Sequence, residues 1–210
     1  MTGAYGMGTI RITASTGDGR ISQNEDNYTG AHDASTGTVD NTSVSINIGQ
    51  ILTGGRYYIY RGFIPFNTSL LTGKKLMSAS LHVWGNSSSG LWNYIAIQQG
   101  SGGAPHQPLI DEDYNKTQYS GNGGQILSGN FQINGWNTII LNAFGLGTIN
   151  LTGTTIFPLR VGQDITENAP LASELLNIGS TEDTGHEPYL DVEFESLDGV
   201  MMGNLNWGPH

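Results

Sequence analysis

Acidic side chains are the residues of this sequence best suited to bind a metal ion. Asp111, Glu112 and Asp113 form the densest acidic triplet, and Asp18 lies in a separate stretch dominated by small polar residues and glycine. Carboxylate oxygens in loops are the ligands that Ca²⁺ takes in proteins. These four residues therefore predict calcium as the one candidate cofactor. The alternative is that they are solvated loop acids, because the sequence has no D-x-D-x-D-G calcium loop.

The other residue types that could do chemistry are not arranged for catalysis. None of the five histidines has the H-x-x-x-H spacing of a metal site, and no G-x-S-x-G turn offers a nucleophilic serine. Cysteine is absent, which excludes thiol catalysis and disulfides. Glu193 and Glu195 resemble the paired carboxylates of glycoside hydrolysis, but their spacing places both on one solvent-facing side of a strand. We therefore predict a protein that is not an enzyme.

Aromatic side chains suit a different kind of contact, the stacking of a flat ring on a sugar. Trp84, Trp92 and Tyr94 lie near predicted loops, and Trp92 follows the polar run Ser-Ser-Ser-Gly at residues 87–90, which predicts that its ring is exposed. Large exposed aromatic rings commonly anchor binding partners. The alternative is that the tryptophans, Trp84 and Trp136 in particular, pack against the core.

Composition limits the partners of the chain. Charged residues make up only 12% of it, so its polar surface must come from Asn, Ser, Thr, Gln and the 31 glycines, and the six N-x-S/T sequons follow from that composition. The formal net charge is −10 with only 8 lysines and arginines, whereas nucleic acids and anionic membranes attract clustered cations. We predict neither as a partner. The first residues show no basic start and no apolar run, so no signal peptide is visible, and we expect a location in a virion or outside the cell.

The elements that must position these side chains are strands. Apolar and polar residues alternate at residues 44–48, 77–84 and 189–194, which is the pattern of half-buried strands. Runs rich in aromatic and β-branched residues predict further strands at residues 9–13, 56–66, 95–97, 138–141 and 156–161. Single helical turns are expected at residues 142–147 and 169–176. Short strands separated by turns rich in Gly and Asn predict an all-β fold, a single antiparallel jelly-roll β-sandwich.

Several of these segments occur in an order that resembles a known family. The sequence Y-I-Y-R-G-F-I-P-F-N-T-S at residues 58–69 is followed by G-K-K-L-M-S-A-S-L-H-V at 73–83, G-W-N-T-I-I-L-N at 135–142 and E-P-Y-L-D-V-E-F at 187–194. An earlier D-G-R-I stands at residues 18–21. Together they resemble the DNRLRE-like jelly-roll domains, also classed with carbohydrate-binding modules, which occur in phage structural proteins and bacterial surface proteins. The resemblance covers residues 17–196, with Asn67 where many members have Asp.

The chain ends are predicted to serve in attachment. We divide the chain into an N-terminal arm (residues 1–16), the jelly-roll domain (17–196) and a C-terminal tail (197–210). The tail has three glycines and several large apolar side chains that would be costly to leave in water. We therefore predict that it docks on a partner through Val200, Met201, Met202, Leu205 and Trp207. The alternative is that it folds back onto its own domain.

Three functions fit these observations. The resemblance and the missing catalytic set favour a non-enzymatic structural protein of a virion: a capsid decoration, head-fibre or tail-associated protein that acts through protein and glycan contacts. The second function is a carbohydrate-binding module of a secreted or cell-surface protein. The third is a subunit of an extracellular filament assembled by exchange of terminal strands. The expected partners are other virion or surface proteins and polysaccharide. We also expect a homo-oligomer, with a trimer as one candidate.

Overall fold

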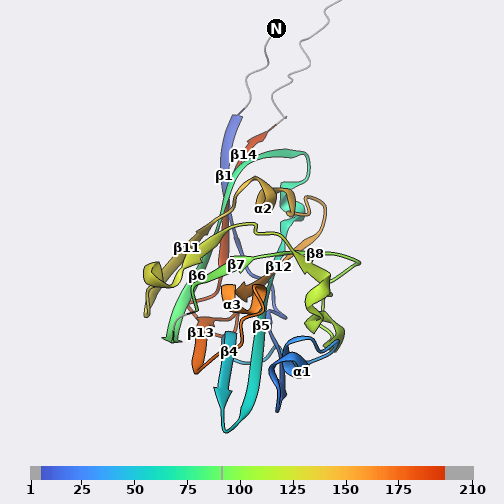
Figure 1. The fold of residues 1–210 in the computed structure, drawn as a ribbon. Helices are drawn as coiled ribbons and strands as arrows, with labels where there is room; N and C mark the ends of the chain where they lie inside the picture. The colour runs from blue at the N-terminus through green and yellow to red at the C-terminus, as the bar shows by residue number, and fades with distance from the viewer. Residues whose placement is uncertain (1–5, 91, 197–210) are drawn as a thin grey trace, which may run out of the picture.

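The computed structural model describes residues 6–90 and 92–196 and shows a mostly β, antiparallel protein. Twelve strands form one strongly curled sheet with the shape of a half-barrel (Figure 1). These strands are β1 (Gly6–Thr13), β2 (Gly19–Glu25), β3 (Thr38–Asp40), β4 (Ser45–Thr53), β5 (Arg56–Asn67), β6 (Lys74–Ser89), β7 (Tyr94–Ile97), β10 (Gln125–Leu127), β11 (Gly135–Ile140), β12 (Thr154–Val161), β13 (Ser173–Gly179) and β14 (Tyr189–Ser196). A separate two-stranded sheet consists of β8 (Gln99–Gly100) and β9 (Tyr119–Ser120).

The helical elements are all short and lie in the connections. The α-helices are α1 (Tyr28–His32), α2 (Ala143–Gly147) and α3 (Gly162–Ile165). The 3-10 helices are η1 (Thr68–Leu71), η2 (Asp111–Tyr114), η3 (Lys116–Gln118) and η4 (Ser128–Asn130). Among the described residues, no helix has the length and apolar character needed to cross a membrane.

Two strands of the sheet, β6 and β5, each pair with three other strands. The order is β1-β14-β6-β13-β4-β5-β12-β7-β10, with β11 also paired to β6, β2 to β5 and β3 to β2. The long strand β6 pairs with β14 along its first half, with β11 in its middle and with β13 at its end. The side chains of β1, β14, β6 and β11 therefore share one surface.

The main core lies inside the curl of the sheet. Most strands of the sheet contribute buried apolar side chains to a single cluster, among them Leu81 of β6, Ile139 of β11 and Leu190 of β14. Because alternate residues of a strand point to opposite faces, the residues between these positions point outward. The same alternation that builds the core therefore determines which side chains of β1, β14, β6 and β11 point to the outer face.

A second apolar cluster covers the outer face of β5. Ile59 and Phe63 of β5 pack there with Ile21 of β2, beneath α1 and the segment that contains Tyr114 and Tyr119. The residues of β5 that alternate with these point to the other face and belong to the main core. This strand is therefore buried on both faces. The outer surface of the sheet is therefore covered at β5 and accessible at β6.

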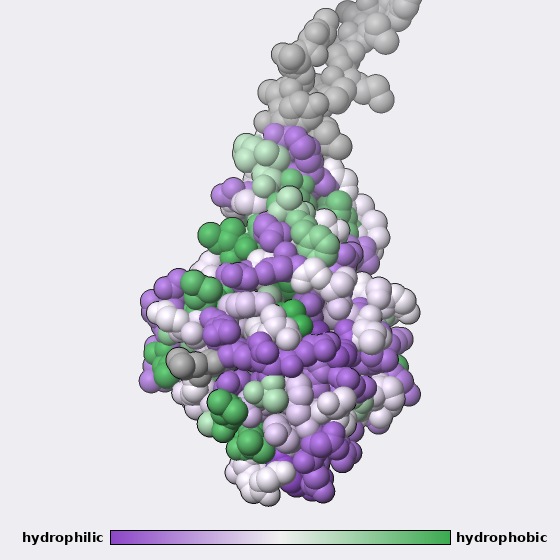
Figure 2. Space-filling model, viewed as in Figure 1, coloured by the Kyte–Doolittle hydropathy of each residue, from purple (hydrophilic) through white to green (hydrophobic). Residues whose placement is uncertain are grey.

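The two ends of the described chain leave the domain at the same place. Gly6, the first residue of β1, is paired with Ser196, the last residue of β14. Figures 1 and 2 show that the molecule narrows toward this end. Residues 6–13 of the predicted N-terminal arm form β1 and are part of the sheet. The predicted docking residues at 200–207 lie outside the described residues.

Most of the expected elements are confirmed. The fold is mostly β and antiparallel, and α2 is the helical turn expected at residues 142–147. The helical turn expected at residues 169–176 is wrong, because β13 occupies the second half of that segment. Leu176 and Ile178 alternate as core residues of β13, which is paired on both sides, with β4 and β6. The strand pairing shows one curled sheet. It does not show the two packed sheets of the expected jelly-roll β-sandwich.

Candidate functional site

The accessible outer side of β1, β14, β6 and β11 presents a continuous set of aromatic and polar side chains. The register brings them into rows across the strands: Trp136 lies opposite Trp84, Tyr189 opposite His82, and Asp191 opposite both Ser80 and Arg11. We call this surface the aromatic–polar face. Its residues are Thr9, Arg11, Ser78, Ser80, His82, Trp84, Trp136, Thr138, Tyr189, Asp191 and Glu193.

Aromatic rings occupy one end of the face. Trp84 stacks on His186 with ring centroids 4.1 Å apart and meets Trp136 edge-on at 5.6 Å. Trp136 also meets Tyr189 edge-on at 4.9 Å. Trp136 is 37% exposed, whereas His186 covers one face of the Trp84 ring. Trp136 is therefore the ring of this cluster best placed to receive a ligand.

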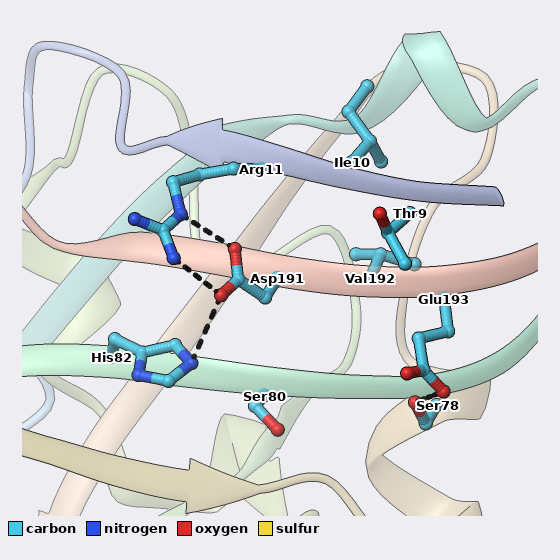
Figure 3. A pocket seen from close by; sticks show the side chains of 9 residues that line it. All are labelled: Thr9, Ile10, Arg11, Ser78, Ser80, His82, Asp191, Val192 and Glu193. Atoms are coloured by element: carbon cyan, nitrogen blue, oxygen red, sulfur yellow. Dashed lines mark hydrogen bonds and ion pairs between the residues drawn. The ribbon is translucent and has the colours of Figure 1, made fainter.

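A charged pair continues the face from the aromatic end. Arg11 Nε and Nη2 each donate to a different carboxylate oxygen of Asp191 at 2.8 Å (Figure 3). The Arg11 guanidinium also lies over the Tyr189 ring, 3.8 Å from its centroid. The hydrogen bonds from Arg11 lower the pKa of Asp191, and the same bonds raise the pKa of Arg11. Both groups are charged at neutral pH, and the fork fixes their orientation.

His82 connects the charged pair to β11. Its ring stacks on Tyr189 at 4.5 Å, and its Nε2 lies 3.6 Å from Asp191 Oδ2. Its Nδ1 lies 3.1 Å from the hydroxyl oxygen of Thr138. Burial lowers the pKa of His82, so the ring is neutral at pH 7. A neutral ring protonated on Nε2 accepts a hydrogen bond from the Thr138 hydroxyl at Nδ1.

An open groove of about 500 Å³ extends along this surface from His82. Figure 3 shows the side chains that line it, which come from β1, β14 and β6. Glu193 closes the far end and accepts a hydrogen bond from the Ser78 hydroxyl at 2.8 Å. The lining therefore combines hydroxyl groups, two carboxylates and a guanidinium, all of which hydrogen-bond readily to a polar ligand.

Comparisons with known proteins assign no family to the chain. No protein-family model matches the sequence, and no curated protein sequence matches it. The chemistry of the aromatic–polar face is accordingly inferred from its own residues.

Only part of the predicted sugar-stacking set lies on this face. Trp84 does, and Tyr94 is half-buried on β7. The expected exposure of Trp92 is wrong: its ring is 1% exposed, packs edge-on against Phe131 and belongs to the main core. Its Nε1 donates to Ser88 Oγ at 2.8 Å, which satisfies its one polar group inside the protein. The alternative that Trp136 packs against the core is also wrong, because its side chain points outward from β11.

The predicted calcium ligands are separated by the fold. Asp111 and Glu112 are exposed on η2, whereas Asp113 is buried and accepts hydrogen bonds from the backbone N–H groups of His106 and Ile110 at 2.9 and 3.1 Å. Among the residues that the structure describes, no three His, Asp or Glu side chains gather where they could hold a metal ion.

Asp18 has a structural position of its own. Its carboxylate is fully buried and accepts hydrogen bonds from the N–H and the hydroxyl of Thr181, which join the start of β2 to the loop between β13 and β14. Burial raises the pKa of Asp18 to about 6, although these hydrogen bonds act in the opposite direction. The folded protein therefore retains this proton at a pH where the unfolded chain has lost it.

This raised pKa predicts a specific pH dependence of stability. A carboxyl whose pKa is higher in the folded state favours folding at low pH, and this contribution is lost as pH rises from about 4 to about 6. Asp18→Asn keeps an acceptor for the Thr181 N–H and has no charge to bury. We expect the stability of the variant relative to wild type to rise by about 2–3 kcal/mol between pH 4 and pH 7.

Urea unfolding at several pH values measures this difference. Asp26→Asn is the matched control, because the Asp26 side chain is 85% exposed. The control should follow wild type at every pH. A constant difference between Asp18→Asn and wild type across the range would show that Asp18 does not titrate as described.

Proposed function

We propose that this protein is a non-enzymatic structural domain of a virion or extracellular surface, and that its aromatic–polar face binds polysaccharide. The observation that carries the proposal is the exposed Trp136 ring, which shares the aromatic–polar face with a groove lined by hydrogen-bonding side chains. We also propose that the domain is a jelly roll similar to carbohydrate-binding modules.

The two parts of the face suit the two kinds of surface on a sugar. One side of a sugar ring carries mainly C–H groups, which pack against a flat aromatic ring such as Trp136. The hydroxyl groups around the ring need polar partners, and Arg11, Asp191 and Glu193 supply charged ones along the groove. Because two of these three groups are carboxylates and the whole chain has a net charge of −10, neutral polysaccharides are favoured over acidic ones.

The protonation states of the face support binding without catalysis. Glycoside hydrolysis needs one carboxylic acid that keeps its proton near neutral pH. Asp191 has a lowered pKa because Arg11 holds it as a carboxylate, and His82 is neutral because its pKa is lowered as well. At Asp191 and His82 the groove therefore offers a fixed charge and a neutral hydrogen-bonding ring.

The shape of the domain supports a structural role. Both described chain ends leave from the narrow end, where Gly6 is paired with Ser196. A domain attached through this end would keep its wide part free for contact with other molecules. This arrangement suits a decoration, fibre or tail-associated protein, and equally a module on a secreted or surface protein.

Trp136→Ala tests the binding face directly. We expect wild type to bind at least one neutral polysaccharide, and the variant to bind it roughly 30-fold more weakly, the effect of losing an aromatic anchor worth about 2 kcal/mol. Leu171→Ala is the control, because Leu171 is an exposed apolar residue outside the face. It should bind as wild type does.

The measurement is affinity electrophoresis against a panel of neutral and acidic polysaccharides. Circular dichroism melting of each variant shows whether the domain is intact. The proposal is abandoned if wild type binds no polysaccharide in the panel, or if folded Trp136→Ala binds as tightly as Leu171→Ala.

A further inference from the structure

The outer edge of β1 is an unprotected sheet edge. All eight residues of β1 pair with β14 on one side, and no described residue forms a strand on the other side. Natural proteins usually shield such edges with proline, lysine or a bulge. β1 has neither residue, and its pairing with β14 runs without a register shift. Its one charged side chain, Arg11, is turned onto Asp191 and Tyr189.

The backbone groups that point to this edge can be identified. Ala14 N–H donates to the Pro188 carbonyl on the β14 side, and Ser15 N–H donates to the Pro65 carbonyl on the opposite side. Because backbone groups alternate in direction along a strand, the N–H groups of odd-numbered residues of β1 point away from β14. Met7, Thr9, Arg11 and Thr13 therefore present their N–H and C=O groups to the free edge.

A shallow pocket and exposed apolar side chains lie beside this edge. A shallow pocket of about 240 Å³ is lined by Met7, Gly8, Thr9 and Glu193. Met7 is 65% exposed, and Ile10 is only partly buried where it joins the main core. A strand added at this edge would gain backbone hydrogen bonds along β1 and would cover apolar side chains on the core side.

We propose that residues 200–207 of a second copy of this chain add to β1 as a new edge strand. This segment has the same number of residues as β1, so the two match over about 26 Å. It contains no proline, lysine or acid. Its odd-numbered positions are Met201, Gly203, Leu205 and Trp207, so one side of an extended strand would be apolar.

The starting point of the tail favours a second copy over the same copy. The tail follows Ser196, which is paired with Gly6, so β1 already occupies the position beside β14. To reach the outer edge of its own β1, the tail would have to cross two strand spacings, about 10 Å, within residues 197–199. Four Cα–Cα steps join Ser196 to Val200 and span at most about 14 Å when fully extended, so nearly all of this length would go into crossing β1 and reversing direction. A tail from another copy has no such restriction.

Charge permits this contact. The chain has a net charge of −10, but β1 carries no acid and residues 200–207 carry no charge. The contact joins two different surfaces of the chain, so each copy can accept one tail and donate another. Such head-to-tail contacts extend into open assemblies unless rotation closes them into a ring. This inference does not depend on polysaccharide binding.

Two variants test the contact from its two sides. Thr9→Pro removes an N–H that points to the free edge and leaves the β14 ladder intact, since proline is tolerated at such edge positions. Thr9→Val is its matched control, because it also loses the hydroxyl but keeps the N–H. Trp207→Asp alters the tail and lies outside the described domain, so it tests the contact even if Thr9→Pro does not fold.

Sedimentation velocity of the full chain over a range of concentrations gives the result. We expect wild type and Thr9→Val to form a series of oligomers as concentration rises, and Thr9→Pro and Trp207→Asp each to remain monomeric. An equal mixture of these two variants should form dimers and nothing larger, because one copy retains the edge and the other retains the tail.

Other outcomes overturn the proposal. A wild type that is monomeric at all concentrations rejects the contact between copies. Oligomers that persist in Trp207→Asp but are lost in Thr9→Pro indicate β1 pairing with β1 and reject the tail as the added strand. A mixture that yields no dimer, or a wild type that forms only closed trimers unaffected by Thr9→Pro, rejects it as well.

Discussion

Arg61→Ala is expected to destabilise the protein by about 3–5 kcal/mol, a large fraction of the total stability of a typical domain. Arg61 lies in the middle of β5 and is fully buried. Its Nε and Nη2 donate to the two carboxylate oxygens of Asp164 at 3.0 and 2.9 Å. It also donates to the carbonyl groups of His32 and Tyr114. One side chain thus joins β5 to α1, to η2 and to α3.

The size of the effect follows from what the substitution leaves behind. Asp164 is fully buried and also accepts a hydrogen bond from Arg160 Nε at 2.6 Å. Burial by itself would raise the pKa of Asp164, but the charges of Arg160 and Arg61 outweigh it and hold the pKa well below its usual range. Removing one partner of a buried ion pair leaves charge and hydrogen-bonding groups without compensation. The carbonyl groups of His32 and Tyr114 would lose their donor at the same time.

The matched control lies on the same strand. Arg56, at the start of β5, forms an ion pair with Asp26 in which both side chains are substantially exposed. Exposed pairs contribute about 0–1 kcal/mol, so Arg56→Ala should change stability by no more than that. Urea unfolding of both variants at pH 7 compares them. A loss below about 1 kcal/mol for Arg61→Ala would mean that the buried network does not hold these segments together.

The buried network around Arg61 could be predicted only in part from the sequence. A single arginine inside the apolar run Y-I-Y-R-G-F is visible in the sequence, and it signals either an exposed position or a buried charge with a partner. The partner, Asp164, lies 103 residues away, and no local pattern connects the two. The strand itself was predictable because its β-forming residues act locally, whereas the pairing depends on the complete fold.

The strands β14 and β11 differ in the same way in how far the sequence predicts which side chains are buried. In β14, polar residues separate Leu190, Val192 and Phe194, so the buried side could be read directly. At the end of β11, Ile139 and Ile140 are followed directly by Leu141, and the sequence offers no alternation that would assign Trp136 to either side. The register with β6 decides it, since Ile139 lies opposite Leu81 in the core and Trp136 consequently points outward.

The N-x-S/T sequons have a structural explanation in three places. In each, the Asn Oδ1 accepts hydrogen bonds from both the backbone N–H and the hydroxyl of the Ser or Thr two residues later. The pairs are Asn67 with Ser69, Asn115 with Thr117, and Asn150 with Thr152. Such Asx turns make the same spacing useful for closing a loop. The sequence pattern therefore reports turns in this fold.

Phe63→Ala is expected to cost about 3–5 kcal/mol, as truncations of large buried aromatics do. Phe63 is fully buried in the second cluster, and its ring packs against Tyr119 with centroids 5.7 Å apart. It lies between two strands, opposite Gly19 of β2 and Pro158 of β12. The backbone of three strands meets there, so the surrounding structure has little freedom to fill the cavity that alanine would leave.

The same substitution tests whether the two apolar clusters unfold together. β5 contributes Phe63 to the second cluster and the neighbouring Ile64 to the main core, so separating the clusters would require breaking this strand's own packing. We therefore expect one transition in wild type and in Phe63→Ala, with the midpoint of the variant lowered. Leu81→Ala, in the main core, should give the same behaviour with a loss of about 2–5 kcal/mol.

Two probes distinguish joint from separate unfolding. Trp92 lies in the main core, and Trp84 and Trp136 lie on strands that help to build it, so their fluorescence reports that part of the domain, whereas far-UV circular dichroism reports all strands. The two probes should give coincident urea transitions in wild type, Phe63→Ala and Leu81→Ala. Leu70→Ala is the control on the segment that follows β5, because Leu70 is 59% exposed, and it should change stability by no more than about 0.5 kcal/mol. If Phe63→Ala shifted the circular dichroism transition but not the fluorescence transition, the second cluster would be an independent unit resting on a sheet that is stable without it.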